Sequence, residues 1–384
     1  MTTWSVVKDD TRQKRRRELI PRIALLACLA LVVVSLGMAF SPGSPKEPAA
    51  PPFSEQARSA ALADAMRLRA AGEELGRSTA GGGQPAVART VSLLTTQARA
   101  LLVPGQDGTA SLPAPEAPSS AALSGPPSGA APTSAPLPAT AAALAAELEA
   151  SASQRLADAT VADGGIARLL AAVGTAQLLQ ASSLAAAADA PAPALTDPAA
   201  PQLSGACPSA PPSPAPSAAS SQAAASEGPD TGPASLPGAL AATVRTELEA
   251  VYGYQVALTR LGGDAAVSAS QQLASHEALA AGAEALSRMH CAAAPAREAG
   301  YTMTPEFLAS PAAGLGGLEA SSLTVYGDLV ALSEGQTRQW AISGLVGAAR
   351  RSALWGADTG VLPGLAADPE GFPELPAPSL TPSP

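Results

Sequence analysis

The positions of the aromatic residues limit where this 384-residue chain can build a well-packed core. Trp4, Phe40 and Phe53 come early, and no further aromatic residue occurs until Tyr252. The remaining aromatic residues all lie between Tyr252 and Phe372. Because large rings supply much of the apolar surface that a core buries, we expect the best-packed domain in the C-terminal third.

Stretches rich in proline, alanine and serine divide the rest of the chain. The chain contains 38 prolines and 34 glycines, and segments of this composition bury too little apolar surface to fold. We therefore expect four segments without fixed structure: a stalk at 41–52, an insert at 104–138, a linker at 190–236 and a tail at 362–384.

An alanine-rich helical region is expected at residues 53–189, on both sides of the insert. Apolar residues recur there at helical spacing, which predicts helices over 53–78, 84–103, 139–160 and 161–188. Alanine dominates the apolar faces of these helices, so we expect thin packing and marginal stability.

Residues 237–361 are expected to form the principal domain. Helical periodicity covers four segments with short, long and short connections between them, at 237–261, 263–291, 310–335 and 337–357. That order of connections is typical of an antiparallel four-helix bundle with one crossover, as in ferritin-like folds. The predicted fold class is therefore all-α.

The N-terminal segment indicates where the chain is located. Residues 23–40 (IALLACLALVVVSLGMAF) carry no charge over a length near the lower limit for crossing a bilayer. The basic residues of segment 1–22 place that segment in the cytoplasm and the rest of the chain outside it. We predict a single-pass anchor in the cell membrane. A secreted form, after cleavage near Ala39, and a lipoprotein attached at Cys28 remain alternatives.

Two cysteines lie outside the predicted membrane segment, Cys207 in the linker and Cys291 at the end of a helix. Cysteine pairs outside the cytoplasm tend to be oxidised. A Cys207–Cys291 disulfide is our hypothesis, and two unpaired thiols are the alternative, because sequence does not determine the distance between them.

Polar residues interrupt the apolar faces of three C-terminal helices. Glu247 and Tyr254 lie two turns apart on the apolar face of the first helix. The third helix repeats this spacing with Glu319 and Tyr326. His276 lies on the apolar face of the second helix. Because the repeated pair is on helices related by the pseudo-twofold symmetry of such a bundle, we expect these side chains to meet in the core.

The cluster allows two interpretations. The first is a buried polar network, in which His276, the two phenols and Arg338 or Arg350 offset the charges of the carboxylates. The second is a pocket for a small polar ligand, lined by the same residues.

A metal site is not expected in the cluster. A di-iron bundle needs a Glu-x-x-His pair on each of two helices. Leu273 and Ser287 stand three residues before the two histidines, and the fourth helix has no Asp, Glu or His. We therefore predict no metal, no cofactor and no catalytic residue.

The C-terminal region resembles a ferritin-like domain of unknown function found in actinobacterial envelope proteins. The segments ELEAVYGY (247–254) and RRSALW (350–355), together with His276, Glu319 and Tyr326, carry the resemblance, which covers roughly residues 237–365. Residues 140–188 are similar to the region that precedes this domain. The resemblance implies a four-helix fold and no established reaction.

These observations predict a membrane-anchored extracytoplasmic protein that acts as an interaction or scaffold module for an unidentified envelope partner. A ligand-binding or enzymatic bundle is the alternative. The net charge of −9, with seven of the 23 Lys and Arg residues clustered in segment 1–22, excludes the basic surface expected of a nucleic-acid-binding protein.

Overall fold

Every element of regular secondary structure in the described part of the chain is helical, as predicted. The computed structural model describes residues 51–78, 85–102, 137–191, 200–205, 207 and 234–376, and no strand occurs among them. The predicted segments 1–22 and 23–40 lie outside these residues, as does almost all of the insert 104–138 and most of the linker 190–236.

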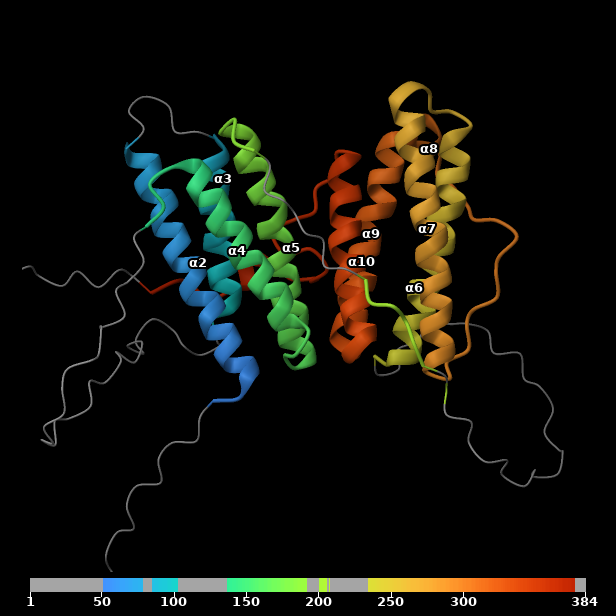
Figure 1. Cartoon of the computed structure of the whole chain (residues 1–384). Helices are drawn as coiled ribbons and strands as arrows, with labels where there is room; N and C mark the ends of the chain where they lie inside the picture. The colour runs from blue at the N-terminus through green and yellow to red at the C-terminus, as the bar shows by residue number, and fades with distance from the viewer. Residues whose placement is uncertain are drawn as a thin grey trace, which may run out of the picture. The chain divides into compact units, whose positions relative to one another are not determined.

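Four helices from the alanine-rich region pack together and are called here the N-terminal helical group (Figure 1). They are α2 (Phe53–Ser78), α3 (Pro85–Leu101), α4 (Ala141–Ala159) and α5 (Gly164–Ala187). The pairs α2–α3 and α4–α5 make the closest contacts. Their shared core consists mainly of alanine and leucine side chains, such as Ala65, Leu68, Leu148 and Leu170. Small alanine side chains let these helices pack without aromatic residues.

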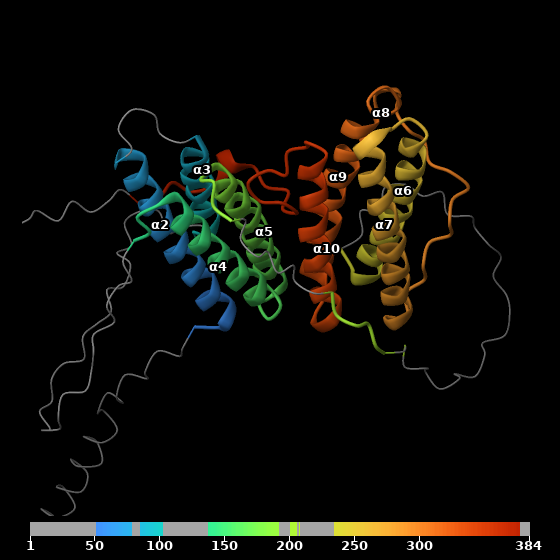
Figure 2. The same ribbon diagram turned by 45° about the horizontal axis from the view of Figure 1, so that its top comes forward.

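The C-terminal helical group contains the aromatic residues. It comprises α6 (Leu236–Leu258), α7 (Gly263–Met289), α8 (Pro305–Ala309), α9 (Pro311–Leu332) and α10 (Gly335–Leu354). The closest helix pairs in this group are α6–α7, α6–α9 and α9–α10. The short helix α8 lies at one end of the group in both Figure 1 and Figure 2. Ser235 and Thr304 begin α6 and α8 by accepting hydrogen bonds from the backbone N–H groups of Gly238 and Phe307.

The described residues from Pro52 onward belong to one compact unit, and the two helical groups share an interface within it. Helix α5 contacts α9 and α10 of the C-terminal group. Arg168 on α5 forms an ion pair with Asp328 on α9 at 2.6 Å, and Arg338 on α10 donates to the carbonyl oxygen of Ala162. Among the described helices, α5 is the one long and apolar enough to cross a membrane, and 67% of that apolar window is buried inside the protein.

Part of the segment expected to be an unstructured tail is ordered. Residues 362–376 contain a short 3-10 helix, Pro369–Gly371, and Leu362 is buried. Arg99 on α3 donates hydrogen bonds to the carbonyl oxygens of Phe372 and Pro373. The expectation was wrong here because Pro-rich composition measures local folding tendency, whereas this segment is held by contacts with residues far away in sequence.

A disulfide connects the linker to the C-terminal helical group. Cys207 is bonded to Cys291, which directly follows the C-cap of α7, and their Cα atoms are 5.3 Å apart. The nearby residue Ser204 also receives a hydrogen bond from Gln336 on α10. Residues 204 and 207 of the linker are therefore attached to α10 and to the end of α7. The two cysteines are bonded, which contradicts the alternative of two unpaired thiols.

Candidate functional site

Helices α6 and α9 exchange hydrogen bonds between their glutamate and tyrosine side chains. Tyr254 on α6 donates to Oε1 of Glu319 on α9, and Tyr326 on α9 donates to Oε1 of Glu247 on α6, each at 2.7 Å. On each helix the glutamate and the tyrosine are seven residues apart, or about two helical turns. Each glutamate can face the other helix's tyrosine because the two helices run antiparallel. The repeated Glu-x6-Tyr spacing thus produces one reciprocal arrangement.

His276 on α7 lies between the two carboxylates. Its Nδ1 is 2.8 Å from Oε2 of Glu247, and its Nε2 is 2.7 Å from Oε1 of Glu319. All three side chains are almost completely buried, with exposed fractions of 0 to 1%. An ionised carboxylate only accepts hydrogen bonds, and a neutral imidazole has only one N–H. With both carboxylates ionised, the two ring contacts are satisfied together only when His276 is a doubly protonated imidazolium.

A second cation reaches the cluster from α10. Nε of Arg351 donates to Oε2 of Glu319 at 2.9 Å. This guanidinium belongs to Arg351 and not to Arg350, the residue named from sequence. Arg338, the other arginine considered, donates to the backbone of Val330 and Ala162 instead. Two carboxylates, one imidazolium and one guanidinium have a summed charge of zero, which is the condition under which buried charges are tolerated.

The pKa shifts agree with this charge assignment. Burial lowers the pKa of His276, but its hydrogen bonds and charge interactions with Glu247 and Glu319 raise it further, so the net shift is upward. Burial raises the pKa of Glu319, while His276 and Arg351 lower it more, so the net shift is downward. Burial and the adjacent carboxylates raise the pKa of both tyrosines, Tyr254 and Tyr326. The phenols therefore remain protonated hydrogen-bond donors.

Two tryptophans and a glycine of α10 hold the tyrosine rings in place. Trp355 donates from Nε1 to the hydroxyl oxygen of Tyr254 at 2.8 Å, and Trp340 packs on the ring of Tyr326 with centroids 5.7 Å apart. A Cβ atom at Gly344 would collide with the ring of Tyr326. Gly344 therefore allows the tyrosine ring to approach the helix backbone.

The sequence patterns did not identify Gly344, Arg351, Trp340 or Trp355 as members of the site. A signal was present in the spacing: positions 340, 344, 351 and 355 follow one face of α10 at intervals of four and seven residues. Glu247, Tyr254, His276, Glu319 and Tyr326 all meet in the core.

The cluster does not fit a metal ion. All four carboxylate oxygens already face O–H or N–H donors, from Tyr326 and His276 on Glu247, and from Tyr254, His276 and Arg351 on Glu319. A metal ligand must offer a free lone pair, and an imidazolium has none on its nitrogens. No group of three or more His, Cys, Asp or Glu in the described residues is arranged to hold a metal.

Two surface pockets lie away from the cluster. The larger, of about 680 Å³, is lined by α6, α8, α9 and the segment before α8, and the smaller, of about 360 Å³, by α9 and the segment 358–369. None of the cluster residues lines either pocket. The cluster is a closed hydrogen-bond network that connects α6, α7, α9 and α10.

A family model matches the region that contains this network. Residues 239–367 match the model of a family described as a domain of unknown function, DUF4439. The match includes every residue of the network. Searches among curated proteins and among solved structures each found no match. The family description adds no reaction, so the function has to be argued from the geometry.

Proposed function

We propose that this protein is anchored in the cell membrane and presents a ferritin-like four-helix bundle outside the cytoplasm as a protein-interaction or scaffold module. One observation carries the proposal. The carboxylates, the imidazole and the phenols of the C-terminal helical group hydrogen-bond to one another and to Arg351 in a buried, charge-balanced network. Groups that are buried and fully hydrogen-bonded have neither the access nor the free proton that a catalyst needs.

The network has a structural use in such a module. It joins residues of α6, α7, α9 and α10, and each oxygen of the two carboxylates accepts from a donor at one particular helix register. Buried polar networks of this kind can specify a single arrangement of helices where apolar packing alone would allow sliding. A rigid group of helices with a fixed surface suits a binding module.

Two observations support the location. The uncharged run at 23–40 follows a basic segment, which is the pattern of an anchor with its N-terminus in the cytoplasm. The Cys207–Cys291 disulfide follows that run in the sequence, in the part of the chain proposed to be outside the cytoplasm. Disulfides persist mainly in oxidising compartments of that kind.

The alternative, a ligand-binding or enzymatic bundle, would require the network to open. Its carboxylates, imidazole and phenols are almost completely buried, so a ligand would have to break several buried hydrogen bonds, each costly to leave unmade.

Cross-linking in native membranes tests the proposal. The tagged full chain is cross-linked and purified, and co-purifying proteins are quantified against untagged cells. We expect one or a few partners that are recovered equally well by the wild type and by Tyr326→Phe at a temperature where both are folded. If Tyr326→Phe loses a bound small molecule or a measurable turnover while its folding is intact, the scaffold proposal is wrong and the ligand-binding alternative is favoured.

A further inference from the structure

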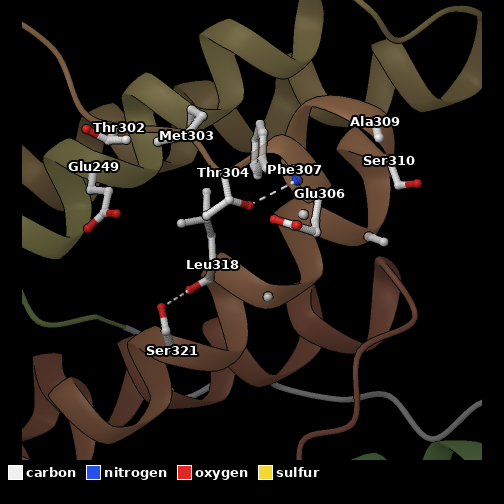
Figure 3. A pocket seen from close by; sticks show the side chains of 13 residues that line it. Glu249, Thr302, Met303, Thr304, Glu306, Phe307, Ala309, Ser310, Leu318 and Ser321 are labelled. Atoms are coloured by element: carbon white, nitrogen blue, oxygen red, sulfur yellow. Dashed lines mark hydrogen bonds between the residues drawn. The ribbon is translucent and has the colours of Figure 1, made fainter.

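The larger of the two surface pockets lies beside the short helix α8. It has a volume of about 680 Å³ and lies between α9, α8 and the segment 302–304, with Glu249 of α6 at one end (Figure 3). Volumes of several hundred Å³ are typical of binding sites. We refer to this site as the α8–α9 groove, lined chiefly by Glu249, Met303, Glu306, Phe307, Gly317 and Leu318.

The floor of the groove is apolar and is deepened by a missing side chain. Phe307 and Leu318 supply apolar surface, and Figure 3 shows both beside the open space. Gly317 lies on the groove side of α9, and a Cβ atom there would meet nothing within 4 Å. A side chain at position 317 would therefore begin on the groove side of α9 with no clash at its Cβ atom.

All ionisable side chains that line the groove are acidic. Glu249 and Glu306 line it, whereas no Lys, Arg or His does. Neither carboxylate makes an ion pair or a side-chain hydrogen bond with any other described residue, although Arg245 is only one turn before Glu249 on α6. Figure 3 shows the two carboxylates on the same open space. The groove thus offers two unpaired negative charges above an apolar floor.

One wall of the groove has unused backbone hydrogen-bonding groups. Thr302 and Met303 have no regular secondary structure, and their N–H and C=O groups bond to no other backbone group in the described residues. An extended polypeptide can bond to such free main-chain groups through its own N–H and C=O groups. A small ligand would leave most of these groups in water.

We propose that the α8–α9 groove binds an extended segment of a partner protein, with a lysine or arginine of that segment placed between the carboxylates of Glu249 and Glu306. The apolar stem of the basic side chain would cover Phe307 and Leu318, while its charged end meets the glutamates. This inference rests on the proposed interaction role and specifies which surface and which partner chemistry carry it.

A phage-displayed library of random heptapeptides, selected on the full chain in lipid nanodiscs, tests the groove. We expect the selected peptides to share one Arg or Lys flanked by apolar residues. For the tightest peptide, measured by fluorescence anisotropy, Glu249→Gln and Glu306→Gln should each weaken binding about tenfold. Gly317→Leu, which fills the groove, should abolish binding without lowering the melting temperature. Glu277→Gln, an exposed change on α7, is the matched control and should leave binding unchanged.

The outcomes separate this inference from the proposed function. No selected peptide, peptides without a basic preference, or binding that survives Gly317→Leu would each overturn the groove assignment. Selection of peptides that match other segments of this same chain would also overturn the assignment, because the occupant would then not be a partner protein. If native partners still co-purify with Gly317→Leu as well as with the wild type, the scaffold role stands and its binding surface lies elsewhere.

Discussion

Tyr326 and Glu247, 79 residues apart in sequence, share a 2.7 Å hydrogen bond in which both side chains are fully buried. Tyr254 and Glu319 form the reciprocal bond between the same two helices. His276 connects the two pairs through contacts with both carboxylates. The duplicated Glu-x6-Tyr spacing is therefore used as one interlocked unit, and its physical consequences can be measured.

Removing either buried phenol hydroxyl should destabilise the protein. Tyr326→Phe and Tyr254→Phe each leave a carboxylate oxygen without that donor, at a cost of about 1–3 kcal/mol. Because the two tyrosines act through one network, their effects should not add in the double variant. Thermal and urea unfolding followed by circular dichroism measure this. Tyr252→Phe, on the half-exposed flank of α6, should change stability by less than about 0.5 kcal/mol.

His276 should be an imidazolium at neutral pH. Both ring nitrogens face carboxylates, so nitrogen NMR should show two protonated ring nitrogens at pH 7. His276→Ala removes the cation between two buried carboxylates, which should cost about 3–5 kcal/mol. Added imidazole should restore part of that loss. A spectrum with one unprotonated ring nitrogen, or a variant as stable as the wild type, would contradict the assignment.

The stability of the folded protein should decline both above and below neutral pH. The pKa of His276 is raised on folding, so its stabilisation is complete below the unfolded value of about 6.5 and is lost as pH rises through the folded value. The pKa of Glu319 is lowered, so its contribution is present above its unfolded value and is lost as pH falls through the folded one. The alkaline decline should disappear in His276→Gln and persist in His290→Gln.

Gly344→Ala should destabilise the protein although alanine favours helices. The added Cβ atom would meet the ring of Tyr326, and overpacking of this kind costs about 1–3 kcal/mol. Gly317→Ala, also within a helix but facing open space, provides the contrast and should raise stability by up to about 1 kcal/mol. Equal effects of the two substitutions on the melting temperature would show that Gly344 does not control the packing of Tyr326.

Loss of the disulfide should loosen the attachment of the linker. Cys207→Ser, Cys291→Ser and the double variant should lose the same amount of stability, about 2–4 kcal/mol, because each removes the same bond. Mass spectrometry of the unreduced wild type, alkylated under denaturing conditions, should show that neither cysteine is modified. Modification of both would contradict the bond.

Periodicity alone was sufficient for much of this protein. Spacings of three, four and seven residues place Glu247, Tyr254 and His276 on the inner faces of their helices, because side chains so separated point to one side of a helix. The aromatic residues concentrate in the C-terminal helical group because rings pack well in a dedicated core. Neither argument requires knowledge of which helices are neighbours.

Tertiary structure alone decided three other features. Arg350 and Arg351 differ by about 100° around α10, and only the packing of that helix determines that Arg351 reaches Glu319. The ordered segment 362–376 depends on contacts with α3, far away in sequence. The α8–α9 groove combines α6, α8, α9 and the segment before α8. Local sequence specifies which way a side chain faces within its own helix, whereas the identity of its partner follows only from how distant segments pack.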